Sequence, residues 1–325
     1  MNNQKIGVLL LNLGGPDSLE AVPSFLLNLF SDPDIFRFPL GWITQPLFAR
    51  MITRARSKKV QEYYRLIGGR SPLLALTRAQ AIALRAELRR RGVAVEFAIA
   101  MRYWRPFTDD ALEELEHRGV NRLIVLPLYP QYSLATTESS VKELKKCLAR
   151  RNSSLKPEVV EPYHLDDGYL DSLSDRLEEG LRRCARDGGG EVEILVSAHG
   201  LPESFIRRGD PYQRQIKEDV AALMHRFPDR KFHLSYQSRV GPVKWIGPST
   251  DEMLRELGLA GVKRLLVVPI SFVSDHIETL YEIDLLYGEQ ARRAGITYFR
   301  RIRSLNGSPL FIRALASLVE KKIRA

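Results

Sequence analysis

Residues 106–127 read PFTDDALEELEHRGVNRLIVLP, and residues 248–269 read PSTDEMLRELGLAGVKRLLVVP. The two segments align without gaps at a fixed offset of 142 positions, and 12 of their 22 residues are identical. Each copy has a helical pattern, beginning at Thr108 (a plausible N-cap) or at Thr250, followed by a glycine and an aliphatic run. Internal repeats constrain the architecture strongly, so we predict two similar α/β domains, each about half the chain.

Strand-like runs alternate with helical patterns along the rest of the chain. Several runs are continuous stretches of Val, Ile and Leu, as is typical of strands buried on both faces of a parallel sheet. Ligands bind at the carboxyl ends of such strands, so we expect the residues that follow them to face one cleft between the domains. The expected strands cover residues 6–13, 93–101, 122–128, 192–197, 231–236 and 264–270.

Beyond the repeat, the two copies carry different chemistry. Residues 128–137 (LYPQYSLATT) align with residues 270–279 (ISFVSDHIET). The first segment is neutral, aromatic and rich in hydroxyl groups, whereas the second contains two acidic residues and a histidine. This divergence predicts a cleft whose two walls differ chemically. The dipeptides Arg102-Tyr103 and Lys244-Trp245 also share the offset of 142 and are taken as equivalent.

Four carboxylates follow the second copy. Asp275, Glu278, Glu282 and Glu289 are spaced by 3, 4 and 7 positions, so we expect them on one face of a helix. Such a stripe can pass a cation or a proton from one carboxylate to the next. The alternative is a solvated acidic face at a helix N-terminus, which the helix macrodipole favours.

A histidine ends one of the apolar strands. His199 lies between Ala198 and Gly200, so we expect it to point into the cleft, although a hydrogen-bonded core histidine is the alternative. One histidine and one glutamate are too few for a structural zinc site, which usually has four protein ligands. A site with only two protein ligands suits a metal ion that is bound briefly and then transferred to another molecule. No P-loop and no strand-linked GxGxxG occurs, which disfavours nucleotide chemistry.

The charge of the chain is unevenly distributed. The 325 residues carry a net charge of +10, and two segments hold the excess. Residues 50–91 contain 12 Lys/Arg against 2 Asp/Glu, and residues 291–325 contain 9 against 1. A basic protein is expected to have an acidic partner. No aromatic-rich RNA motif or zinc-finger spacing accompanies these segments, so we expect no nucleic acid.

The two cysteines and the N-terminus indicate the compartment. Cys147 and Cys184 form no CxxC motif, which fits a reducing environment, and the first residues lack a signal-peptide layout, so we expect a cytoplasmic protein. Residues 22–48 are strongly apolar but contain four prolines and cannot form a membrane span. They are expected to be either a lid covered by the core or an exposed lip for a flat ligand or a bilayer.

Eight motifs spread over nearly the whole chain are highly specific when taken together in their order. They are LLNLGGP (10–16), YRLIGGRSPL (64–73), MRYWRP (101–106), YPQYSLATT (129–137), SAHGLP (197–202), RGDPY (208–212), SRVGPVKWIGPSTDE (238–252) and FVSDHIETLYEID (272–284). On these motifs the chain resembles the ferrochelatase family, whose members insert Fe²⁺ into a porphyrin.

The resemblance implies an α/β fold of two similar Rossmann-like domains. Each would be a four-stranded parallel sheet flanked by helices, with the active-site cleft between them. We expect an N-terminal domain at 1–163 that carries the lip at about 22–48, and a C-terminal domain at 164–304. A C-terminal helix at 305–325 would pack back on the N-terminal domain.

The resemblance also implies roles for individual residues. His199 and Glu278 would be the catalytic residues and would contact the metal. A metal or proton path would follow a partly π-helical segment through Asp275, His276 and Glu282. The resemblance allows either His199 or Glu278 to take the pyrrole protons, and iron to enter from either side. The substrate-binding residues would be Arg102, Tyr103, Trp245, Tyr132, Ser133 and Asn12.

The implied activity is a lyase reaction, the insertion of Fe²⁺ into protoporphyrin IX with release of two protons as the last step of heme biosynthesis. Fe²⁺ is a substrate, and no cofactor is expected because the chain ends VEKKIRA without the cysteines of a [2Fe–2S] cluster. We expect a monomer that associates transiently with the inner membrane face. The alternatives are coproporphyrin III or another tetrapyrrole as substrate, and a non-catalytic porphyrin or heme carrier.

Overall fold

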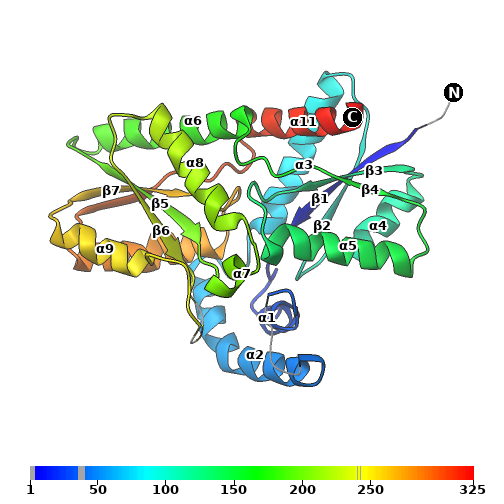
Figure 1. Cartoon of the computed structure of the whole chain (residues 1–325), viewed down its shortest axis with the longest axis horizontal. Coiled ribbons are helices and arrows are strands. Elements are labelled where there is room, and N and C mark those ends of the chain that lie inside the picture. The colour runs from blue at the N-terminus through cyan, green and yellow to red at the C-terminus, as the bar shows by residue number, and fades with distance from the viewer. Residues whose placement is uncertain (1–3, 36–40, 240, 242) are drawn as a thin grey trace. The chain divides into compact units, whose positions relative to one another are not determined.

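The computed structural model describes residues 4–35, 41–239, 241 and 243–325, with only the backbone for Trp42 and Ile43. The chain divides into two compact units, which are described separately (Figure 1). The N-terminal unit comprises Met1–Tyr129, Ser133–Pro162 and Leu315–Ala325. The C-terminal unit comprises Pro130–Tyr132 and Tyr163–Ala314.

The N-terminal unit is built on a four-stranded parallel sheet in the order β2-β1-β3-β4. Its strands are β1 (Ile6–Asn12), β2 (Glu96–Met101), β3 (Arg122–Pro127) and β4 (Pro157–Val159). Almost every residue of β1 is buried, as its unbroken apolar run predicts for a strand with helices on both faces. The helical elements of this unit are α1 (Val22–Phe30), α2 (Gly41–Leu66), α3 (Leu73–Arg90), α4 (Thr108–His117), the π-helix η1 (Leu134–Glu138) and α5 (Ser139–Arg150).

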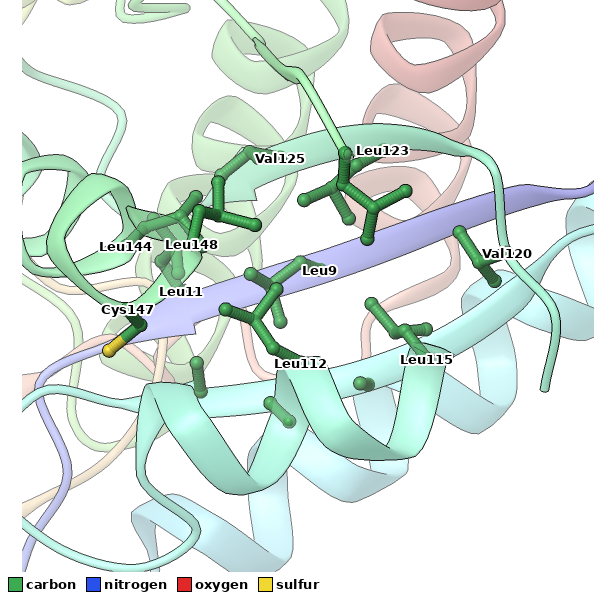
Figure 2. Close-up of a cluster of buried hydrophobic side chains, with 14 of the residues drawn as sticks. Leu9, Leu11, Leu112, Leu115, Val120, Leu123, Val125, Leu144, Cys147 and Leu148 are labelled. Atoms are coloured by element: carbon green, nitrogen blue, oxygen red, sulfur yellow. The ribbon is translucent and has the colours of Figure 1, made fainter. Parts of the chain in front are cut away.

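One face of this sheet carries the main core of the N-terminal unit. Figure 2 shows α4 and α5 lying over β1 and β3, with the leucines of the helices pointing at those of the strands. Leu9 of β1, Leu112 of α4 and Leu144 of α5 are completely buried in this cluster. Helix α3 contacts β2.

The C-terminal unit repeats this plan, with a parallel sheet in the order β6-β5-β7-β8. Its strands are β5 (Glu193–His199), β6 (Phe232–Gln237), β7 (Arg264–Pro269) and β8 (Tyr298–Arg301). The cluster around Leu265 and Val267 of β7 packs against α9, η2 and α10. The helical elements are α6 (Asp167–Arg186), α7 (Glu203–Arg207), α8 (Tyr212–Arg226), α9 (Thr250–Leu259), the π-helix η2 (Glu278–Tyr287) and α10 (Gly288–Arg293), and α11 (Pro309–Arg324) begins in this unit.

The duplication and the expected fold class are both confirmed. The pairs α4/α9 and β3/β7 have identical bounds at the offset of 142, and the two sheets have the same strand order. The expected N-cap at Thr108 is wrong by one residue, because Thr108 is already helical and Asp110 accepts a hydrogen bond from the N–H of Phe107. In the second copy, Ser249 caps the helix by accepting from the N–H of Glu252.

Helix α11 belongs to both units. The unit boundary lies between Ala314 and Leu315, within the helix. Inside the N-terminal unit, Glu320 accepts a hydrogen bond from Arg91 at 2.7 Å, and Arg122 donates to the carbonyl of Ile323 at 2.8 Å. These contacts hold the end of the chain against α3 and β3.

The apolar segment at 22–48 contains α1 and the start of α2. The apolar residues Val22, Phe25 and Phe30 of α1 are buried, so this part is covered. In α2, by contrast, Leu47 is 69% exposed and Met51, just after the segment, is 56% exposed. The expected lip residues at 36–40 lie outside the described residues. Among the helices that the structure describes, none combines the length and apolarity needed to cross a bilayer.

The repeat predicts equal sensitivity at equivalent core positions. Leu112 and Leu254 occupy the same place in the two copies, and both are buried. Truncating either to alanine should lower the free energy of unfolding by about 2–5 kcal/mol, because it removes apolar contacts and leaves a cavity. Urea denaturation followed by circular dichroism measures this. The control Leu259→Ala, at a site 90% exposed, should shift the value by less than about 0.5 kcal/mol. A free energy of unfolding that Leu254→Ala leaves unchanged would contradict the equivalence of Leu112 and Leu254.

Candidate active site

The carboxyl end of β5 places a histidine beside a glutamate. His199 is the last residue of β5, and its Nδ1 lies 2.8 Å from Oε2 of Glu278, the first residue of η2. The backbone of His199 is fixed on both sides, since its N–H donates to Ser271 Oγ and its carbonyl accepts from the Tyr212 hydroxyl. The two residues that the resemblance implied as catalytic therefore form one hydrogen-bonded pair in the C-terminal unit.

The charges of this pair are set by burial and by each other. Burial raises the pKa of Glu278, but the charge and hydrogen bond of His199, together with His276 and Ser238, outweigh it and hold that pKa at about 2. Burial lowers the pKa of His199, but the Glu278 carboxylate outweighs this effect and the net shift is upward. The carboxylate is therefore ionised at neutral pH, and the histidine binds its proton more tightly than a free imidazole does.

A second histidine lies beside the pair. His276 Nε2 is 4.0 Å from Oε1 of Glu278, and the ring packs on Phe272 at a centroid distance of 4.4 Å. Burial lowers the pKa of His276, and Glu278 only partly opposes that effect. The pKa values of the two imidazoles beside Glu278 are therefore shifted in opposite directions, and His276 loses its proton at a lower pH than His199 does.

The end of β6 contributes two residues to the same cluster. The hydroxyl of Ser238 lies 3.1 Å from Glu278 Oε2 and 2.5 Å from Glu282 Oε2, and its backbone N–H donates to Glu282 Oε1 at 2.8 Å. Gln237 Nε2 donates to the carbonyl of Glu278 and to the carboxylate of Glu282. Burial and the nearby Glu278 charge raise the pKa of Glu282. Neither Ser238 nor Gln237 is among the site residues predicted from the sequence.

The predicted stripe of four carboxylates on one α-helical face is wrong. Residues 278–287 form a π-helix, whose i→i+5 hydrogen bonds change the spacing at which side chains share a face, and Asp275 precedes it. Glu289 lies in α10 and pairs with Arg292 and Arg293. Only Glu278 and Glu282 of the four are joined through shared partners.

Asp275 has its own set of donors. Its carboxylate accepts from Arg301, Ser304 and Asn306 at 2.8 Å each, and Arg301 also makes two hydrogen bonds of 2.9 Å to Asp284. Burial raises the pKa of Asp275, but the Arg301 guanidinium and the hydrogen bonds from Asn306, Ser304 and Thr279 together outweigh it, so the net pKa is lowered. This network fixes the chain just before η2. A role for Asp275 in a metal or proton path stays a prediction.

Two of the expected substrate residues of the N-terminal unit, Arg102 and Tyr103, contact a buried aspartate. Asp32 accepts hydrogen bonds from Arg102, from the hydroxyl of Tyr103 at 2.6 Å and from the hydroxyl of Ser139. Tyr103 is only 1% exposed. Asn28 of α1 donates to the carbonyl of Tyr103, so the same cluster fixes α1. Asp32 lies in the apolar segment at 22–48 and is not among the site residues predicted from the sequence.

The other expected substrate residues are divided between the units. In the N-terminal unit, Asn12 donates to Thr77, and the buried Ser133 caps η1 by accepting from the N–H of Ala135. In the C-terminal unit, the backbone N–H of Tyr132 donates to Gln215. Substrate binding by these residues stays a prediction.

Trp245 packs against Gly200, the residue that follows His199 at the end of β5. It forms an isolated antiparallel bridge with Pro202. A Cβ added at Gly200 would lie 2.8 Å from the carbonyl oxygen of Gln237 and 3.2 Å from the Trp245 ring. The position after His199 therefore has no room for a side chain.

The sheet registers correct one sequence alignment. Leu11 pairs with Pro127 and Ser197 with Pro269, while Asn12 pairs with Met101 and Ala198 with Tyr236. Met101 is therefore equivalent to Tyr236. It follows that the structural counterparts of Arg102-Tyr103 are Gln237-Ser238 and not Lys244-Trp245.

The reason is a longer loop in the second copy. Met101 donates its N–H to the carbonyl of Pro106, five positions on, whereas Tyr236 donates to Pro248, twelve positions on. In the part of the chain that the structure describes, no group of three or more His, Cys, Asp or Glu side chains is arranged to hold a metal ion.

Three comparisons bear on this architecture. A family model described as Ferrochelatase matches residues 5–323. A protein named Ferrochelatase from Geotalea uraniireducens is 50% identical over 320 residues, covering 98% of this chain and 98% of that protein. Another of that name, from Gloeothece citriformis, is 46% identical over 320 residues, covering 97% of this chain and 82% of that protein.

Solved structures with the same fold include two of SirB. The sirohydrochlorin chelatase SirB from Bacillus subtilis subspecies spizizenii, in complex with cobalt, has a TM-score of 0.57 at 12% identity and covers 99% of this chain and 96% of that chain. SirB from Bacillus subtilis with Fe³⁺ has a TM-score of 0.56 at 12% identity, covering 98% and 96%. At this identity the likeness supports the two-domain chelatase fold alone.

The His199–Glu278 pair predicts a measurable change in titration. Glu278→Gln removes the charge but keeps the burial, so the pKa of His199 should fall below the ordinary histidine value. NMR titration of the histidine ring protons measures this. In the unaltered protein the pair stabilises the fold fully at pH values below the ordinary histidine pKa. This contribution to stability is lost as the pH rises through the raised pKa of His199. Glu193→Gln, which alters the partner of His233 instead, is the control. An unchanged His199 titration in Glu278→Gln would contradict the assignment.

Proposed function

Because the chain belongs to the ferrochelatase family, we propose that it inserts Fe²⁺ into protoporphyrin IX to form protoheme, the last step of heme biosynthesis. The reaction replaces two pyrrole N–H protons with one Fe²⁺, so two protons leave and the charge balances. The iron must also lose its water shell, and the ring must buckle until its nitrogen lone pairs point out of plane. The site therefore needs a base, a transient ligand for iron and walls that hold a bent ring.

The observation that supports this proposal most strongly is the 2.8 Å contact between His199 and Glu278. The carboxylate occupies Nδ1, so Nε2 is the ring nitrogen that can take a pyrrole proton. The raised pKa of His199 means that it becomes a free base only above the ordinary histidine value. The rate should therefore rise as pH passes through that raised pKa.

Glu278 gives the pair its second role. It stays ionised through the physiological range, and an anionic oxygen is a good ligand for Fe²⁺. Two candidate ligands, His199 and Glu278, would hold iron weakly enough to release it to four pyrrole nitrogens. We propose that protons or iron move to or from this pair along a path formed by Asp275, His276 and Glu282.

The test is an anaerobic assay of the purified protein with Fe²⁺ and protoporphyrin IX, followed by the absorbance of protoheme. His199→Ala should lower kcat by at least about 100-fold, because general-base catalysis contributes about 10²–10⁴-fold. Porphyrin binding, measured by fluorescence, should remain. His225→Ala removes an exposed histidine of α8 and should behave as the unaltered protein. Near-normal turnover by His199→Ala would remove it as the base, and binding without insertion by the unaltered protein would favour a carrier.

The choice of tetrapyrrole is a separate question with its own comparison. We propose protoporphyrin IX over coproporphyrin III because an apolar segment suits a substrate with only two carboxylates. Steady-state turnover with each porphyrin in the same assay decides between them. A larger kcat/KM for coproporphyrin III would reverse this part of the proposal and leave the metal-insertion chemistry unchanged.

We also propose that α2 associates with an anionic membrane surface. Leu47, Met51, Arg54 and Lys58 are spaced by 4, 3 and 4 positions, so they lie on one side of the helix, and all four are exposed. Apolar and basic side chains on one exposed face are the combination that binds the boundary of an acidic bilayer. A cytoplasmic protein with such a face would meet the membrane where a porphyrin of low solubility collects.

Vesicle sedimentation tests this association. The protein should bind vesicles that contain phosphatidylglycerol, bind neutral phosphatidylcholine vesicles less, and be released as salt rises. The double variant Leu47→Glu/Met51→Glu should weaken binding at least tenfold, whereas Leu259→Glu, at a leucine of α9 that is 90% exposed, should not. Binding that ignores both lipid charge and salt would contradict the proposal.

A further inference from the structure

Ser238 adopts a backbone conformation that serine rarely takes. Its φ is +67°, in the left-handed region that favours glycine. Among the described residues, two other non-glycine residues have positive φ, and both are asparagines, Asn152 and Asn306. Asparagine tolerates this region through local hydrogen bonds, while holding other residues there costs on the order of 1–3 kcal/mol. Such strain persists where the surrounding contacts impose it.

The contacts of Ser238 explain why it is held there. Its backbone N–H and its hydroxyl reach the two oxygens of Glu282, at 2.8 and 2.5 Å. The same hydroxyl lies 3.1 Å from Glu278 Oε2, the oxygen that bonds His199. Ser238 therefore joins the side-chain carboxylates of the two glutamates of η2, whereas Gln237 reaches only the backbone carbonyl of Glu278.

The first copy of the repeat supplies an independent comparison. By sheet register, the counterpart of Ser238 is Tyr103, whose hydroxyl donates to the buried carboxylate of Asp32 at 2.6 Å. In both copies the second residue after the equivalent strand positions Met101 and Tyr236 presents a hydroxyl to a carboxylate. In the first copy that carboxylate comes from the end of α1, and in the second it comes from η2. The strand end thus acts in both units as a holder for an acidic side chain.

From these contacts we propose that Ser238 is a positioning residue for metal insertion. Its hydroxyl holds Glu278 against His199 and sets the separation of Glu278 from Glu282. Ser238 itself touches no substrate in this role. The effect on turnover rests on the proposed function, whereas the effect on the glutamates does not.

Two variants separate the hydroxyl from the backbone. Ser238→Gly keeps the N–H bond to Glu282 and relieves the left-handed strain, and Ser238→Ala keeps the strain; both remove the hydroxyl. Each should lower kcat for iron insertion at least tenfold, with the protoporphyrin dissociation constant unchanged. Crystal structures of both should show Glu278 displaced from His199. Asn152→Gly, which relieves the same strain in the turn after α5, should have normal turnover.

The outcomes distinguish this inference from the proposed function. If Ser238→Gly has normal turnover and only Ser238→Ala is impaired, Ser238 matters only for the backbone conformation of the turn, and the inference fails. If both variants keep normal turnover or an undisturbed His199–Glu278 contact, it also fails. If the unaltered protein inserts no iron, the proposed function fails, and the crystal structures still decide whether Ser238 holds the glutamates.

Discussion

All strands of a parallel sheet run in the same direction, so the chain must cross back between one strand and the next. The carboxyl ends of the strands therefore all lie at the same end of the sheet. The candidate site of the C-terminal unit depends on this constraint. His199 ends β5 and Gln237 ends β6, and these two residues pair in the register. The turn after β7 supplies Ser271, and η2 follows with Glu278. Residues almost eighty positions apart in sequence thus meet without any dedicated scaffold.

Much of this fold could be predicted from sequence because its signals are local. Six strands lie close to where strand-like runs, several of them continuous aliphatic stretches, predict them, and the repeat predicts two α/β units. The edge strands β4 (PEV) and β8 (YFRR) were not predicted individually, since they are short, only partly buried and not apolar runs. The pair His199 and Glu278 was chosen by resemblance, and the geometry of their contact needed the structure.

The failures at the site have a common physical cause. The predicted stripe of carboxylates assumes an α-helical period, but residues 278–287 form a π-helix. The predicted equivalence of Arg102-Tyr103 with Lys244-Trp245 assumes a constant offset, but the loop that joins the preceding strand to the repeat differs in length between the copies. Asp32 had no recognisable signal, because its partner Arg102 lies 70 positions away and only packing brings them together. Ser238 was hidden for a similar reason: a serine after a strand is unremarkable in sequence until its φ is known.

The seven extra residues between Tyr236 and Pro248, relative to the span from Met101 to Pro106, carry a wider consequence. They lie between two anchored points, the strand pairing of β6 and the hydrogen bond from Tyr236 to Pro248, and they leave both sheets in the same register. They also bring Trp245 against the glycine beside His199. A duplicated domain can thus change what surrounds its strand ends by lengthening one surface connection, at a cost in loop entropy of well under about 1 kcal/mol per doubling. The two halves of this chain thus differ in chemistry at their strand ends while they keep the same strand order.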